Sequence, residues 1–559
     1  MQDNLQTQPA QSVQPAQPMQ PMQPVQPTET PETKCMREKF GFFGLATLIY
    51  AIFYAFCMIH NDAGIAFLFF LAATVVYFGL TLFQLKVTFK KRNIFYIISI
   101  LLLGVSTICT DSWVIIHLNK LAILLLVMCL LLNQYFDTAK WNLLKFTGSI
   151  CQLMAMSFGQ LGRPFVDGIT YFKEKGKLNK KVLYALLGVL IAIPILAVAT
   201  SLLSSADALF WHLTDSLWRG IYLDDILNLA VRICFLFFAS YTLTAYLCKH
   251  SIREEVRDLR KGEPVLAITV MSLLSVLYLV FSAIQILALF LGKMQLPEGY
   301  TYAAYAREGF FQLLTVSILN LFLVLICLSF FRSSKVLKVV MTIMSLCTLV
   351  MCASSMMRMI IYIRYYYLTI LRVFVIWTLV AVFVLFIGVL ISIYRESFPL
   401  FRYGVVTITL LYLALSFSHP DYIVARVNLA NAPGIDGEGW SESEEQDYGE
   451  NFFSGPFFLG REYDDYFYLE QLNTDAAPAV IPYMKSLNYD LSAYDQLEPV
   501  ISGYPYSEDE MTVDEQKRFG YYYLQGNKEA IESMSLRTFN VSRYMAGKLI
   551  KDCDGRMEK

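Results

Sequence analysis

Six ionisable residues close to long apolar segments are the side chains of this chain best suited to chemistry. A charge placed in hydrocarbon is costly unless it is paired or hydrated, so such residues often mark a functional site. We expect the six to form one polar cluster near the outer membrane face. The alternative is that the long arginine side chains merely reach the lipid headgroups. The six residues are Asp207, Arg232, Arg307, Glu308, Arg358 and Arg372.

Catalytic motifs are missing from the sequence. It contains no phosphate-binding loop, no zinc-protease motif, no nucleophile elbow and no dinucleotide-binding motif. We therefore predict no catalytic residue and lean towards a protein that is not an enzyme.

Histidines and carboxylates expected on the outer side are candidate metal ligands, but their spacing does not favour a metal. Each histidine lies in a different loop, with no short ligand motif of the kind that zinc sites use. We predict neither a metal nor a cofactor. The histidines are His60, His117, His212 and His419, and the carboxylates are Asp62, Asp111, Asp207 and Asp421.

The composition indicates the environment in which these residues must lie. The chain has 559 residues, of which 56% are hydrophobic and only 16% are charged, whereas about 25% of residues are charged in ordinary soluble domains. This balance excludes a water-soluble enzyme with one modest core, a disordered chain and a disulfide scaffold. A multi-span membrane protein remains.

Eleven apolar runs are each close to the length that crosses a bilayer. Because lipid cannot satisfy a strand edge, we predict helices and hence an all-α, polytopic transmembrane bundle. No acidic residue lies near the middle of a run, which disfavours a proton- or cation-coupled transporter. The runs are about 41–59, 63–85, 94–110, 114–135, 182–205, 227–248, 265–291, 310–331, 339–360, 373–394 and 403–419.

The distribution of basic residues predicts the orientation. With the N-terminus inside, the inner loops after the first span carry 22 Lys and Arg, against 6 in the outer loops up to Arg372. Cytoplasmic loops are enriched in these residues, so we predict a cytoplasmic N-terminus. An odd number of spans then places the C-terminus outside the cell. The basic charges lie in short loops between spans, so we predict no nucleic-acid partner.

The chain divides into three predicted parts. Residues 1–39 form a disordered, Gln/Pro-rich cytoplasmic tail, residues 40–419 form the transmembrane domain, and residues 420–559 form a small, mainly helical, acidic outer domain. Within the second part we predict a cytoplasmic interfacial segment near 137–181. A crossing by Trp141–Phe158 would place the basic loop that follows outside, so we favour a helix lying in the interface.

Several short stretches of the sequence carry a likeness to a known family. They are Leu202–Phe210, Tyr305–Leu313, Leu368–Arg372, Asp421–Asn428 and Asn473–Pro478. On these stretches the chain resembles the bacterial multi-span family catalogued as domain of unknown function 4173, related to group 4153, from about residue 90 to 550. The resemblance implies a bacterial cytoplasmic-membrane protein and supplies no activity or catalytic residues.

Three functions fit these observations. The first is a non-enzymatic envelope sensor, scaffold or regulator. The second is a permease or flippase for an anionic or lipid-linked solute, with Arg232, Arg358 and Arg372 as counter-charges. The third is a membrane-embedded transferase with Asp207 or Glu308 as base. The expected partners are membrane lipids and a protein bound through the acidic outer domain or the Gln/Pro-rich tail. The oligomeric state stays open.

Overall fold

The structure is a computed structural model that describes ten stretches of the chain and a few single positions. The stretches are 30–59, 63–138, 143–175, 223–249, 260–287, 309–366, 368–395, 397–430, 465–486 and 515–553. The single positions are 61, 141 and scattered residues between 188 and 207.

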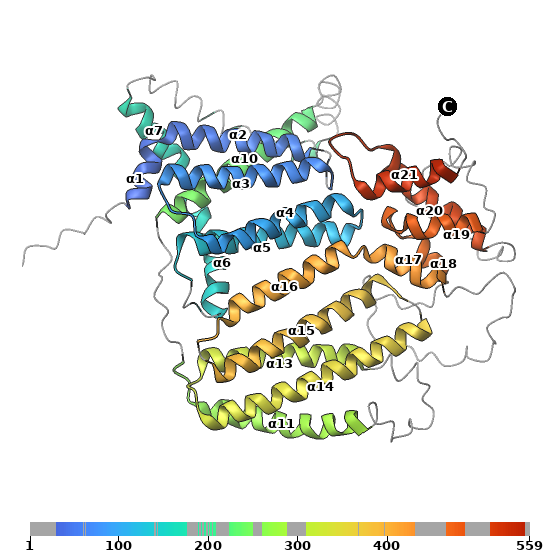
Figure 1. The fold of residues 1–559 in the computed structure, drawn as a ribbon. Helices are drawn as coiled ribbons and strands as arrows, with labels where there is room; N and C mark the ends of the chain where they lie inside the picture. The colour runs from blue at the N-terminus through green and yellow to red at the C-terminus, as the bar shows by residue number, and fades with distance from the viewer. Residues whose placement is uncertain are drawn as a thin grey trace, which may run out of the picture.

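Helices make up the described part of the chain, and the prediction of an all-α polytopic bundle is confirmed. Within it, the only pairing of strand type is an isolated bridge between Gly262 and Phe331. Ten helices are long and apolar enough to cross a membrane, and they lie side by side (Figure 1). They are α2 (Phe40–Met58), α3 (Ile65–Leu85), α4 (Ile94–Cys109), α5 (Trp113–Tyr135), α10 (Leu223–Cys248), α11 (Pro264–Gln285), α13 (Phe310–Phe330), α14 (Lys335–Tyr366), α15 (Ile370–Tyr394) and α16 (Leu400–Phe417).

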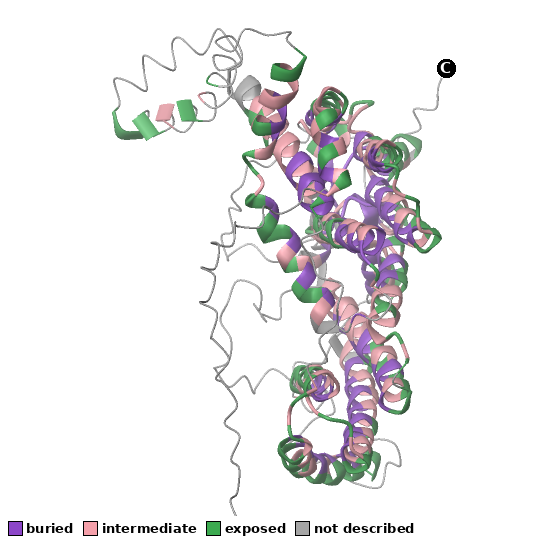
Figure 2. Cartoon of the chain, turned by 90° about the vertical axis from the view of Figure 1, so that its left-hand side faces the viewer, coloured by how far each residue is buried: buried purple, intermediate pink, exposed green. Residues whose placement is uncertain are grey.

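The surface of these helices is as apolar as their contacts. At most half of the residues in any span are buried, yet large apolar side chains such as Phe83 and Leu273 are 81% and 71% exposed. Figure 2 shows exposed residues along the outward faces of the helices. In water such a surface would aggregate, so these faces are suited to lipid.

The two ends of the bundle differ. One end, which we call the basic end, carries α1 (Pro31–Glu38) and α7 (Arg163–Glu174) together with the short basic loops. The other, which we call the capped end, is covered by the C-terminal helices (Figure 1). Phe43, Leu85 and Cys248 share one buried cluster at the basic end, against which Tyr135 packs. The start of α2 and the ends of α3, α5 and α10 therefore meet there.

This arrangement bears on the number of crossings. Since α5 and α10 both end at the basic end, α10 begins at the capped end. Helix α7, which packs against α1 and α2 at the basic end, and Leu223 at the capped end bound one interval of the chain. The eleventh predicted span, 182–205, falls in this interval and lies largely outside the described residues.

The segment predicted as a disordered tail is helical over its last residues. Helix α1 occupies Pro31–Glu38, inside the predicted 1–39 tail. Thr30 caps it by accepting a bond from the Thr33 amide, and proline is at its first position, where it has no lost hydrogen bond. Met36 is 2% exposed. The prediction of disorder was wrong for these residues, because a Gln/Pro-rich composition gives no sign that Met36 becomes buried. Residues 1–29 lie outside the described part.

Helix α6 (Leu143–Phe158) is the segment whose path the sequence left open. It has 16 residues and runs across the direction of the spanning helices at the basic end (Figure 1). It packs on α10, α5 and α16, and the rings of Phe146 and Phe401 stack with centroids 3.9 Å apart. A crosswise helix at this depth fits an interfacial position, which stays a prediction since no membrane is present.

The C-terminal helices form a separate core on the capped end. Val424, Leu469, Val480, Tyr523 and Ile550 are among its buried residues. Pro482 lies inside α19, and the helix continues through it. The elements are α17 (Pro420–Ala430), α18 (Asp465–Glu470), η4 (Thr474–Ala476), α19 (Ala477–Ser486), α20 (Glu515–Glu532) and α21 (Val541–Cys553).

A close approach between α15 and α16 gives a first prediction. A Cβ atom at Gly388 would overlap the ring of Tyr403, whose hydroxyl donates to the Val384 carbonyl at 2.7 Å. Gly388→Ala should therefore destabilise the bundle by about 1–3 kcal/mol, measured as a lower Tm in detergent. Gly404→Ala is the control, because its Cβ would meet only Leu385 at an ordinary 3.7 Å. Equal Tm values for the two variants would contradict the packing.

The orientation gives a second prediction. An alkaline phosphatase fused after Lys559 should be active, because the positive-inside pattern places the capped end outside the cell. A fusion after Arg332, between α13 and α14 at the basic end, should be inactive. The reverse pattern would invert the protein in the membrane.

Candidate functional site

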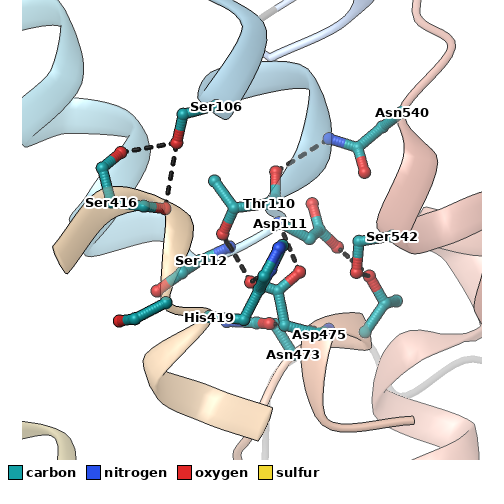
Figure 3. A network of polar contacts seen from close by, with 12 residues as sticks. Ser106, Thr110, Asp111, Ser112, Ser416, His419, Asn473, Asp475, Asn540 and Ser542 are labelled. Carbon is teal, nitrogen blue, oxygen red and sulfur yellow. Dashed lines mark hydrogen bonds and ion pairs between the residues drawn. The ribbon is translucent and has the colours of Figure 1, made fainter. Parts of the chain in front are cut away.

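The strongest polar site in the described residues lies where the C-terminal helices meet the capped end of the bundle (Figure 3). We call it the junction and define it by five ionisable residues: Asp111, His419, Asp421, Asp475 and Arg543. They come from the α4–α5 connection, the α16–α17 turn, the start of α17, η4 and α21. The α4–α5 and α16–α17 connections are short, so the ends of the spanning helices fix where Asp111, His419 and Asp421 lie.

Asp475 is the centre of the junction. It is 4% exposed. Its carboxylate accepts bonds from the Thr110 hydroxyl and from the Asp111 backbone amide at 2.9 Å. His419 Nδ1 lies 3.6 Å from the same carboxylate. A buried carboxylate is tolerated only when such donors replace water, so Asp475 holds η4 on the membrane domain.

Asp111 belongs to the membrane domain and accepts its bonds from the C-terminal domain, which is the reverse of Asp475. Its carboxylate accepts bonds from Arg543 Nε at 2.8 Å and from the Thr474 hydroxyl at 3.0 Å, and Arg543 Nη2 lies 2.7 Å away. Asn540 also donates to the Thr110 carbonyl at 2.8 Å. The membrane domain and the C-terminal domain therefore each supply a carboxylate that the other binds.

Asp421 and His419 carry the clearest electrostatic perturbations. Burial raises the pKa of Asp421 to about 6, and the nearby negative charge of Asp475 adds to this. One of its oxygens is buried without a hydrogen-bond partner among the described residues. The hydrogen bond to Asp475 raises the pKa of His419, against an opposing effect of burial. Burial also raises the pKa of Asp111, although Arg543 opposes it.

His419 also occupies a special backbone conformation. Its φ is 50°, a left-handed conformation that costs energy for most residues other than glycine. The turn ends α16 and starts α17 at Pro420, and it directs the imidazole to Asp475. The strained backbone of His419 therefore places its imidazole beside the buried carboxylate of Asp475.

A second polar chain ties the spanning helices together beneath the junction. The Ser106 and Ser416 hydroxyls lie 2.5 Å apart. The Ser416 and Tyr412 hydroxyls both donate to the side-chain oxygen Oδ1 of Asn119 at 2.8 Å. The side-chain nitrogen Nδ2 of Asn119 donates to the Thr107 hydroxyl at 3.1 Å. This chain links α4, α5 and α16, so the three helices that bear the junction are joined within the bundle.

The α14–α15 turn is the other attachment of the C-terminal domain. The Asn428 side chain accepts from the Leu368 amide and donates to the Leu368 carbonyl, both at 2.9 Å. The Ile370 amide donates to the Tyr468 hydroxyl at 2.8 Å. Burial raises the pKa of Tyr468 to about 12, partly offset by the positive charge of Arg372. Arg372 therefore acts on the contact of the C-terminal domain.

The three described arginines of the predicted cluster have different contacts. Arg232 donates to the Met58 carbonyl at 3.1 Å. Arg358 is 6% exposed and donates to Gln285 at 3.2 Å. The Arg372 guanidinium lies 4.3 Å from the centre of the Tyr362 ring.

The other three members of that cluster are less informative. Asp207 is exposed, and Arg307 and Glu308 lie outside the described residues. Arg358 and Tyr362, one turn apart on α14, lie close to Arg372, so these two arginines share one region. Arg232 instead lies on the α2–α10 contact. The cluster as a whole stays a prediction.

Sequence reasoning identified only part of the junction. Asp111, Asp421 and His419 were among the outer residues considered for a metal, but Asp475 and Arg543 were not singled out. The pattern Asn473-Thr474-Asp475 before two alanines and a proline was the available signal, since it is typical of a capped helix start. In the described residues, no group of three or more His, Cys, Asp or Glu side chains is arranged to hold a metal.

Comparisons with other proteins address the family and leave the activity open. No curated protein and no solved structure matches the chain. A family model described as Domain of unknown function (DUF4153) matches residues 97–481, well over half of the chain, and this range contains four of the five junction residues. The chain therefore belongs to the DUF4153 family of integral membrane proteins whose activity is uncharacterised.

Proposed function

We propose that this protein is a non-enzymatic envelope sensor or regulator whose outer C-terminal domain docks on the membrane bundle in a proton-dependent way. The observation that carries the proposal is the buried Asp475, which receives its bonds from the membrane domain. The proposal places the protein in the bacterial cytoplasmic membrane with a cytoplasmic N-terminus. It also includes the narrower resemblance to domain of unknown function 4173.

The charge of the junction supports this proposal. Three carboxylates face one arginine and one histidine, so one negative charge remains even when His419 is protonated. Within the described part of the chain, further titratable side chains that act on these carboxylates are Tyr468, Tyr523 and Cys109, which are neutral at ordinary pH. A buried excess charge is expensive. The docked state is therefore expected to hold an additional proton.

The direction of the pH effect follows from the shifted pKa values. Asp421 has a pKa of about 6 when docked, against 3.8 ordinarily. Its contribution to docking is present in acid and is lost as the pH rises between these values. His419 has a raised pKa, so its contribution is present below 6.5 and is lost as the pH rises through the raised value. Asp111 acts in the same direction as Asp421.

The same geometry argues against a catalytic role for the junction. A general acid or base must reach a substrate, yet Asp111, Asp421 and Asp475 are 9%, 1% and 4% exposed. Two of these carboxylates are bonded to residues of the opposite domain. The junction carboxylates attach the two domains to each other, so a change in docking would alter the ends of α4, α5 and α16 that bear the junction. A protein partner that binds the acidic outer domain or the Gln/Pro-rich tail can respond to that change.

The main test removes the ionisable group of Asp421. In wild-type protein in lipid nanodiscs, hydrogen exchange of η4 and α21, corrected for the intrinsic effect of pH, should show weaker protection at pH 8 than at pH 5. Asp421→Asn should reduce this difference by about 1.5 kcal/mol, because only about half of the effect of the pKa shift from 3.8 to about 6 develops between pH 5 and pH 8. Glu529→Gln, an exposed acid on α20, is the control. An unchanged pH dependence in Asp421→Asn would refute proton-linked docking.

A second test addresses the charge pair between the domains. Arg543→Met should weaken docking by about 2 kcal/mol, because it leaves Asp111 buried without its cation. Adding Asp111→Asn should recover part of the loss, since the uncompensated charge is then gone. Thermal unfolding of the single and double variants measures both effects. Lys548→Met, exposed on the same helix, controls for general changes in α21, and a double variant less stable than Arg543→Met would contradict the pairing.

A further inference from the structure

A cavity of about 450 Å³ lies at the basic end, at the opposite end of α16 from the junction residue His419. Its walls come from the end of α13, the start of α14, the end of α15 and the turn before α16, with Trp141 beside them. These helix ends lie together in Figure 1. The cavity thus opens at the depth where the spanning helices leave the bilayer.

The polar part of the cavity lining consists of cations and hydrogen-bond donors. Arg260 and Lys338 contribute two cations, and serine hydroxyls contribute further donors, whereas no carboxylate occurs among the described lining residues. The remaining walls are apolar and include Leu328, Met341 and Ile393. Cationic and hydroxyl donors in the same cavity as apolar walls suit an anion that carries a hydrocarbon portion.

Trp141 provides an independent observation. It lines the cavity and is 7% exposed, and its indole nitrogen is buried without a hydrogen-bond partner in the described part of the chain. An indole N–H can only donate, and a buried donor normally has an acceptor. The ring is held by Phe136 and Phe146, with centroids 6.1 and 5.7 Å away. The site is therefore built with a donor that still requires an acceptor.

The loop that bears Arg260 is also held in place. The Gly262 amide donates to the Phe330 carbonyl at 2.9 Å, and the Arg332 amide donates to the Gly262 carbonyl at 3.1 Å. A Cβ atom at Gly262 would come within 2.9 Å of the Phe331 ring, so this pairing favours glycine. The start of α11 is thereby fixed on the end of α13, and Arg260 is kept at the cavity.

We propose that this cavity binds the phosphate group of an anionic amphiphile, namely the headgroup of an acidic phospholipid. Its oxygens would accept bonds from Trp141, Arg260 and Lys338, and its acyl portion would lie on the apolar walls. A soluble phosphorylated molecule shares the phosphate chemistry but has no acyl portion to contact the apolar walls. The site does not depend on the proposed function of the junction, which lies at the opposite end of the bundle.

The test measures retained lipid by native mass spectrometry after reconstitution with phosphatidylglycerol, phosphatidylcholine or inorganic phosphate. Wild-type protein should retain phosphatidylglycerol in preference to phosphatidylcholine. Arg260→Gln and Lys338→Gln should each lower that retention about tenfold, as expected for the loss of one charge-assisted bond. Trp141→Phe, which keeps the ring and removes only the N–H, should lower it severalfold.

Lys335→Gln is the matched control, because Lys335 is exposed in the first turn of α14 and does not line the cavity. It should retain phosphatidylglycerol like the wild type, and the Tm of every variant shows whether the bundle is intact. Equal retention of both lipids, or equal retention by the cavity variants and Lys335→Gln, would overturn the proposal. Variant-sensitive binding of inorganic phosphate without phosphatidylglycerol would overturn the lipid source and assign the site to a soluble phosphorylated ligand.

Discussion

The cost of burying carboxylates at the capped end is the constraint on which the attachment of the two domains depends. Asp475 can leave water only because Thr110, the Asp111 amide and His419 replace its hydration. Asp111 in turn requires Arg543 from the C-terminal domain. Since each domain completes the polar shell of the other, these carboxylates can stay out of water only while the two domains are docked. The position of α17–α21 follows from this reciprocal dependence as much as from the apolar core around Val480 and Tyr523.

The two ends of the bundle solve opposite electrostatic problems. At the capped end the buried ionisable groups are mostly acids, and burial favours their protonated forms. At the basic end the cavity is lined by Arg260, Lys338 and the indole N–H of Trp141, which favour an anion instead. The apolar helices separate the two ends. The compensation that we propose is a proton at the capped end and a lipid phosphate as a ligand at the basic end.

These features bear on the alternative functions. A transferase would need an acid that reaches a substrate, and the acids of the junction are engaged between domains. A permease for an anionic solute would use cations on one path, and of the three candidate counter-charges Arg358 and Arg372 share one region, whereas Arg232 lies apart on the α2–α10 contact. Long interior stretches of α13 and α14 carry only uncharged polar groups such as Asn320 and Thr348, bonded at 3.0 Å. This pattern serves packing between helices and leaves the sensor or regulator as the function best supported.

The sequence alone determined the helical class, ten described spans and the separation of a basic from an acidic part, because lipid imposes length, apolarity and helical structure on every crossing segment. It also pointed to Asp111, His419 and Asp421 as outer residues. Only the tertiary structure decided that these meet Asp475 and Arg543, which lie more than fifty residues further along the chain, and that Trp141 lies beside the start of α14. Such pairings depend on which helix ends lie together. Hydropathy carries no information about that, because every span is apolar enough to face either lipid or another helix.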